Sequence, residues 1–140
     1  MTDLELAINA LPGHSIALCK DGQILTSDKR GIAPMADWIA EEKDLTGYCA
    51  ADLIVGKAAA MLFLKAGIRS VYADTLSESG KKFLEDHGIP VRFRHLTPMI
   101  ENRAKTDICP MERTVLDVTD AETGCRLLLE KLAALRAGKP

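Results

Sequence analysis

The longest apolar stretch of the chain, Leu53 to Ile68, is the feature that most limits how the sequence can fold. Its only charged residues are Lys57 and Lys65, and it is too short to span a bilayer unaided. As a helix it would be apolar around most of its circumference, which a helix tolerates only when neighbours cover it on several sides. We therefore expect a buried central helix that begins near Asp52.

Turn and cap signals divide the rest of the chain into further elements. Asp21-Gly22 lies between two extended-type runs and predicts a hairpin of residues 15–20 and 23–27. Gly67 and Gly88 each end a helix before a β-rich run, which predicts two parallel strands joined by a crossover helix over 78–87. We also expect an opening helix capped by Thr2, a helix over 35–42 that carries Trp38, a helical turn over 98–103, a short helix from Pro110, and a last helix with a capping box at 119–122.

Composition indicates one domain over residues 1–140. The chain is 47% hydrophobic, which is enough to bury a core at this length. The net charge of −2 includes no basic run, so we expect neither a nucleic-acid partner nor a membrane. Without a visible secretory signal or a CxxC pair, reduced cysteines and a cytoplasmic location are expected. The order of elements fits an α/β protein with a mixed sheet covered on both faces.

Three sequence strings carry a resemblance to a known family. They are Ala51-Asp-Leu-Ile-Val-Gly-Lys-Ala-Ala-Ala60, Asn102-Arg103 and Cys109-Pro-Met-Glu112. Together with the order of elements, they resemble a small microbial family described as domain of unknown function 1893. The resemblance covers nearly the whole chain. It implies a three-layer α/β/α, cytidine-deaminase-like fold with an N-terminal hairpin and parallel crossover strands.

The zinc ligands of such deaminases are missing from the sequence. Zinc deaminases place a His or Cys at one helix start and Pro-Cys-x-x-Cys at the next. Here residues 52–57 and 74–78 occupy those places without an imidazole or a thiol. His14, His87 and His95 lack metal-ligand spacing. We therefore expect no metal and no cofactor.

Lys57 is the first candidate for chemistry. It lies near a helix N-terminus, where the helix dipole disfavours a cation. A bound phosphate or carboxylate would compensate its charge, and Gly56 would let that anion approach the backbone. Pairing with Asp52, or extension of the side chain to solvent, explains the charge equally well. Asp52, Gly56, Lys57 and Ala58 are the candidate ligand-binding residues of this segment.

Cys109 is the second candidate, because a following proline places its sulfur at a helix cap. A thiolate there could act as a nucleophile or carry sulfur, with Lys57 as its cationic neighbour. Glu112 would oppose this by raising the thiol pKa, and a structural cysteine is the favoured alternative. Asn102 and Arg103 suit carboxylate or phosphate recognition, or form a solvated helix end. The candidate catalytic residues are Cys109, Lys57 and Glu112.

Three functions remain open from the sequence. The leading hypothesis is a protein, enzymatic or not, with a non-zinc pocket for a small anionic, nucleotide-like ligand; the nucleotide part rests on fold analogy alone. The second is a cysteine-dependent enzyme of thiol or sulfur transfer that uses Cys109. The third is a non-catalytic interaction module, such as a homodimer formed through exposed apolar residues on the Trp38 helix.

Overall fold

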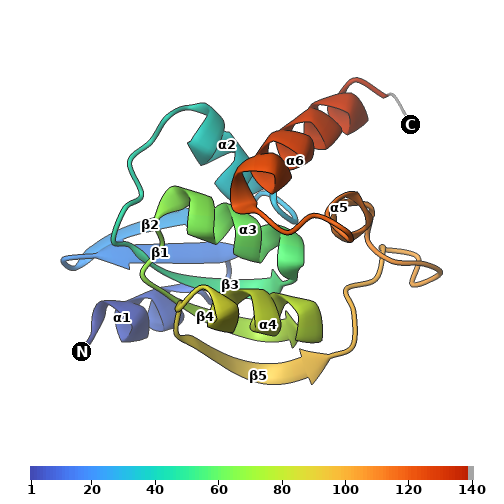
Figure 1. Ribbon diagram of the computed structural model, residues 1–140. Coiled ribbons are helices and arrows are strands. Elements are labelled where there is room, and N and C mark those ends of the chain that lie inside the picture. Colours follow the sequence, from blue (N-terminus) through green and yellow to red (C-terminus); the bar gives the residue numbers. More distant parts are fainter. Residues whose placement is uncertain (139–140) are drawn as a thin grey trace.

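A mixed five-stranded sheet lies at the centre of the computed structural model, which describes residues 1–138 (Figure 1). Along the chain, the elements are α1 (Asp3–Ala10), β1 (Ile16–Lys20), β2 (Gln23–Ser27), α2 (Ala33–Ala40), β3 (Cys49–Val55), α3 (Lys57–Ala66), β4 (Ser70–Ser77), α4 (Glu78–Asp86), β5 (Val91–Thr97), α5 (Pro110–Thr114) and α6 (Ala121–Arg136). The strand order is β2-β1-β3-β4-β5. β1 is antiparallel to both β2 and β3, whereas β3, β4 and β5 are parallel.

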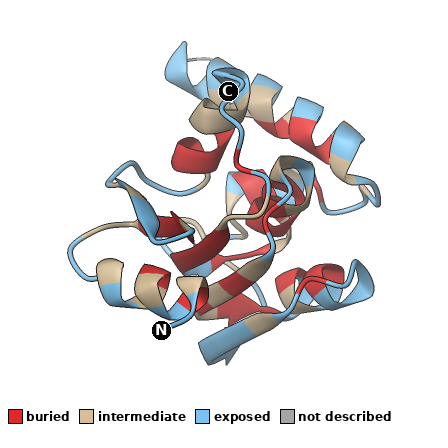
Figure 2. Cartoon of the chain, turned by 90° about the vertical axis from the view of Figure 1, so that its left-hand side faces the viewer, coloured by how far each residue is buried: buried red, intermediate tan, exposed pale blue. Residues whose placement is uncertain are grey.

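Helices cover both faces of this sheet. α1 packs against β1 and β3 on one face, and α3 and α4 cover the other, with α2, α5 and α6 packed onto α3 (Figure 1). The larger apolar cluster, which includes Leu18, Phe63 and Val71, lies on the α3 side, and a smaller one that includes Ala7 and Ala51 lies under α1. Buried residues gather in the sheet and on the helix sides that face it (Figure 2). The arrangement confirms the predicted three-layer α/β/α class.

The N-terminal hairpin and the crossover helix form where local signals predicted them. Asp21 and Gly22 have φ of 50° and 79°, the left-handed backbone that a two-residue hairpin turn requires. Asp3 strengthens the turn, because its carboxylate accepts both backbone N–H groups, at 2.9 and 3.1 Å. Ser77 caps α4 by accepting the N–H of Gly80 at 3.0 Å. These elements confirm the sequence predictions.

The expected start of the central helix near Asp52 is wrong. Residues 49–55 form β3, and the helix begins only at Lys57, after Gly56 in an extended N-cap conformation. Apart from Asp52, β3 consists of apolar residues, and it runs directly into an equally apolar helix, so the two elements form one apolar stretch. Asp52 is therefore a residue of the sheet rather than of a helix.

Two smaller predictions also need correction. Residues 98–103 form no helical turn; they belong to a loop closed by a bridge between Glu101 and Ile108. The last helix is capped by Asp120, whose carboxylate accepts the N–H of Thr123 at 2.8 Å, and not by a box at Thr119. At the helix start, the adjacent polar residues Thr119 and Asp120 could both cap the same backbone N–H groups, and only the folded backbone decides between them.

The apolar side of α2 faces inward. Met35 and Ala36 are buried, and Trp38 and Ile39 are partly buried against the core. This helix therefore lacks the exposed apolar residues that the dimer hypothesis placed on it. No helix within residues 1–138 combines the length and apolar content needed to cross a membrane.

β5 forms one edge of the sheet, and most of its side chains are exposed. Arg92 and Arg94 alternate with Phe93, so cationic and apolar groups line this edge. Arg94 lies 3.9 Å from the carboxylate of Asp74 on the neighbouring strand. This edge of the sheet thus has no neighbouring strand within the described residues, and it carries charged side chains.

The close contact between the starts of α3 and α4 yields a stability prediction. A Cβ added to Gly80 would lie 2.9 Å from the carbonyl carbon of Gly56, whereas one added to Gly124 in α6 would meet the flexible end of Met61. Gly80→Ala should therefore lower the free energy of unfolding by roughly 1–3 kcal/mol, and Gly124→Ala by less. Urea denaturation measures both, and equal losses would contradict the backbone contact.

Candidate functional site

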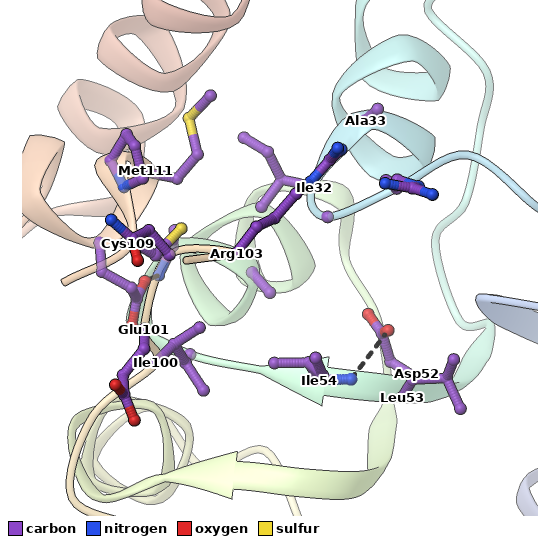
Figure 3. A pocket seen from close by; sticks show the side chains of 18 of the residues that line it. Ile32, Ala33, Asp52, Leu53, Ile54, Ile100, Glu101, Arg103, Cys109 and Met111 are labelled. Carbon is purple, nitrogen blue, oxygen red and sulfur yellow. Dashed lines mark hydrogen bonds between the residues drawn. The ribbon is translucent and has the colours of Figure 1, made fainter. Parts of the chain in front are cut away.

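A cavity of about 660 Å³ opens between the end of β3, the start of α3, residues 30–33 and the segment 100–112 (Figure 3). Its volume lies within the usual range of small-molecule sites. Much of its wall is aliphatic, including Ile32, Ile54 and Ile100. The polar groups that face it are few and come from separate segments of the chain.

The structure brings together most of the site residues predicted from the sequence. Those that line this cavity are Asp52, Gly56, Ala58, Asn102, Arg103, Cys109 and Glu112. Gly56 and Cys109, which are distant in the sequence, thus face one shared space. Lys57 is the exception, because it is not part of the lining.

Glu112 caps the N-terminus of α3. Its carboxylate accepts the N–H of Lys57 at 2.9 Å and the N–H of Ala58 at 2.7 Å. Gly56 makes this possible, because any Cβ there would collide with the Glu112 carboxylate. Burial raises the pKa of Glu112, and the two backbone donors lower it only in part. Glu112 as a whole is 7% exposed and is a structural part of the cavity lining.

This cap changes the interpretation of the Lys57 segment. The sequence suggested a bound anion at these amides, but the anion found there is the chain's own Glu112. The ammonium group of Lys57 donates to the carbonyl oxygen of Leu116, just beyond α5, at 3.1 Å. Lys57 thus holds α5 against α3 instead of pairing with Asp52 or standing beside Cys109 in the cavity.

Asp52 is an acid in apolar surroundings. It lies on β3 between Ile16 of β1 and Ala73 of β4, and it is only 8% exposed. Its carboxylate points from the strand toward the side on which Ile32 lies, and accepts the N–H of Ile54 at 3.4 Å (Figure 3). Burial raises the pKa of Asp52 to about 8, because backbone N–H groups offset only part of the lost hydration.

Two arginines lie at the mouth of the cavity. Arg103 extends from the 100–109 loop toward Ile32 (Figure 3), and Arg30 lines the opposite loop. Both are exposed, and neither guanidinium forms a hydrogen bond or ion pair within residues 1–138, unlike Arg136, which pairs with Asp37. Free guanidinium groups suit carboxylate or phosphate recognition.

Hydrogen bonds fix the loops that carry these arginines. Asn102 accepts the N–H of Thr106 at 3.0 Å, so its side chain shapes the loop that carries Arg103. On the other side, the hydroxyl of Ser15 donates to the carbonyl of Lys29 at 2.6 Å, next to Arg30. Asn102 therefore acts on the site through the loop it orders.

Cys109 is the N-cap of α5, and its side chain makes no capping hydrogen bond. It is partly exposed and lines the cavity, whereas Cys19, Cys49 and Cys125 are buried. All four thiols are free. Cys109 is thus the cysteine that a reagent or ligand in the cavity can reach.

Sequence reasoning missed Arg30 and the particular environment of Asp52. Nothing in the sequence near Arg30 connects it to residues 100–112. A signal for Asp52 was present, because a lone acid between Ala50-Ala51 and Leu53-Ile54 is unusual in a buried strand. That signal can be interpreted only once residues 49–55 are known to form a strand.

The Glu112 cap predicts a stability change. Glu112→Gln keeps the shape but offers one acceptor oxygen where two backbone N–H groups need partners. Leaving one donor unsatisfied should cost roughly 1–3 kcal/mol. Urea denaturation measures the loss, with Glu101→Gln as the matched control, because Glu101 is exposed on the same cavity. A Glu112→Gln protein as stable as this control would contradict the cap.

Asp52 predicts a pH dependence of stability. Its folded-state pKa, about 8, lies above the ordinary value of 3.8, so the folded protein holds the proton across this range and loses stability as pH rises from about 4 to about 8. Asp52→Asn removes this loss, and its advantage over the wild type should grow by roughly 2–3 kcal/mol between pH 5 and pH 7.

Urea denaturation at the two pH values measures this difference. Asp117→Asn, an exposed position outside the cavity, controls for the loss of one carboxylate. An advantage of Asp52→Asn that is the same at both pH values would show that Asp52 is not buried as the structure has it.

Comparison with known proteins identifies the family of the chain. Residues 8–132 match the family model described as Domain of unknown function (DUF1893). The chain is also similar to the crystal structure of a DUF1893 family protein from Thermotoga maritima, with 26% sequence identity and a TM-score of 0.80 over 89% of this chain and 84% of that chain. No curated protein matches the sequence. With a family match that covers most of its length and a solved structure of the same family that shares its fold, the chain belongs to the DUF1893 family.

Proposed function

We propose that the protein binds a small organic anion in the cavity between β3, α2 and the 100–112 segment. The single observation that carries this proposal is the presence of two guanidinium groups, Arg30 and Arg103, at the mouth of a largely aliphatic cavity, neither of which has a partner among the described residues. An apolar body would fill the interior, and its anionic group would meet the arginines. The anion site of this proposal is thus at the mouth, because Glu112 already occupies the helix terminus.

A cytidine-deaminase-like build belongs to the same proposal, and it favours a nucleotide-like ligand only by analogy of fold. The starts of α3 and α4 meet at Gly56 and Gly80, which is where zinc deaminases carry their metal ligands. The residues here do not fit zinc, since these two helix starts carry no imidazole or thiol. Within the described part of the chain, no cluster of three or more His, Cys, Asp or Glu residues could hold a metal ion.

A cysteine-dependent activity is the second candidate, favoured by the position of Cys109 on the cavity wall. A ligand seated near the arginines would lie in the same space as this thiol. The rate of iodoacetamide alkylation at Cys109 as a function of pH tests this candidate. If the alkylation rate depends on pH as it does for an ordinary thiol, Cys109 has no role in the proposed chemistry. The binding proposal would not be affected.

Matched ligand pairs test the proposed function. Thermal unfolding is followed with adenosine 5′-monophosphate against adenosine and with benzoate against benzamide. The anionic member of at least one pair should raise the melting temperature more than its neutral partner, and it should slow alkylation of Cys109. Arg103→Gln should weaken binding of that anion about tenfold, as expected for one charge-assisted hydrogen bond.

Lys105→Gln is the control for Arg103→Gln. Lys105 lies in the same loop and carries the same charge, but it does not line the cavity. It should therefore leave binding unchanged. Equal effects of the neutral and anionic members in both pairs, or equal losses in the two variants, would sink the proposal.

A further inference from the structure

Asp52 presents an acid to the cavity, and no cationic side chain within residues 1–138 pairs with it. It is more than nine-tenths buried, and its carboxylate faces the cavity from β3 (Figure 3). Its side-chain hydrogen bond in the described chain is the long contact from the Ile54 N–H to Oδ1, at 3.4 Å. The second oxygen, Oδ2, is left for a group that enters the cavity.

The free-energy cost of burying the Asp52 carboxyl group without a charged partner points to a ligand. Cross-strand neighbours Ile16 and Ala73 offer Asp52 no polar contact, and buried carboxyls without partners destabilise a fold. An apolar residue would pack there at less cost. A partner for the carboxylate that arrives with a bound molecule explains why an acid occupies this position.

The lining of the cavity carries groups of both charges. Asp52 lies on β3, Arg30 and Arg103 lie on two exposed loops, and aliphatic side chains such as Ile32 and Ile54 line the same space. Other ionisable groups on the lining are Glu101, Cys109 and Glu112, and Glu112 is already satisfied by backbone N–H groups. A molecule complementary to this lining carries both a positive and a negative group.

We propose that the ligand is zwitterionic: a small molecule with a protonated amine or amidine held by Asp52 and a carboxylate or phosphate held by Arg103 and Arg30, joined by an apolar body. This inference rests on the proposed function and specifies its ligand class. The ligand's N–H bonds donate to Oδ1 and Oδ2 of Asp52, and an ionised carboxylate paired with a cation is far less costly than one buried alone.

Binding of a cationic group by the Asp52 carboxylate releases one proton from the protein. Free Asp52 is mostly protonated at pH 7, because burial raises its pKa to about 8. When the ligand's cation pairs with the carboxylate, the carboxyl O–H proton passes to the buffer and the cation keeps its own protons. A ligand that instead offers a carbonyl acceptor to protonated Asp52 releases no proton, so proton release separates these two modes.

The test uses ω-amino acids from 4-aminobutanoate to 8-aminooctanoate, with the matching carboxylates and alkylamines as single-ended probes. Isothermal titration calorimetry at pH 7 in bis-Tris and in Tris, two buffers without an anionic group, gives the affinity and the number of protons released. The best amino acid should bind at least tenfold more tightly than its carboxylate or its amine, with release of close to one proton. Asp52→Asn should abolish this advantage and the proton release while retaining the carboxylate affinity.

Two further variants separate the possible failures. Asp74→Asn, half-buried on β4 and outside the cavity, should behave as the wild type. Arg103→Gln should weaken binding of the amino acid and of the carboxylate equally.

If a carboxylate binds as tightly as its amino acid in both wild type and Asp52→Asn, the zwitterion inference is wrong and anion binding stands. Amines that bind through Asp52 without any effect of Arg103 would overturn the proposed function instead, and absence of binding by the whole series would overturn both.

Discussion

The carboxylate of Glu112 is the contact on which the cavity depends. It joins α5 to the start of α3 across 54 and 55 residues of sequence, through two short hydrogen bonds to backbone N–H groups. Lys57 adds a second connection, from the same helix start to the carbonyl of Leu116. Together with the buried side chains of Met111 and Val115, these contacts hold α5 and the segment before it against α3, where Arg103 and Cys109 line the same cavity as Asp52. One internal ion therefore satisfies a helix terminus and closes the wall of a site.

Much of the fold could be predicted because its signals are local. The hairpin turn at Asp21-Gly22 and the cap at Ser77 depend on a few neighbouring residues, and both form as expected. The boundary between β3 and α3 could not be found in this way, because an apolar central strand and a helix buried on most sides give the same apolar run. Only Gly56 marks the junction, and a single glycine does not distinguish a helix start from a turn.

The site could be predicted as a set of residues but not as an arrangement. The strings at 51–60, 102–103 and 109–112 do converge on one cavity. Their roles depend on contacts between distant segments. Glu112 caps α3, Lys57 holds α5 against α3, and Asp52 is a buried acid that lines the cavity. Arg30 belongs to the site only because the sheet carries the hairpin's exit loop to the cavity. These contacts depend on how the strands and helices are arranged in space, and that arrangement cannot be read from the sequence.

The open edge at β5 has a consequence for how copies of the chain meet. A strand with free backbone N–H and C=O groups invites pairing with another strand, and long apolar edges lead to aggregation. Arg92 and Arg94 stand on this edge, so the β5 strands of two molecules would bring four guanidinium groups together. Repulsion between these groups opposes the growth of a continuous intermolecular sheet at an edge that also exposes the apolar side chains of Phe93 and Leu96.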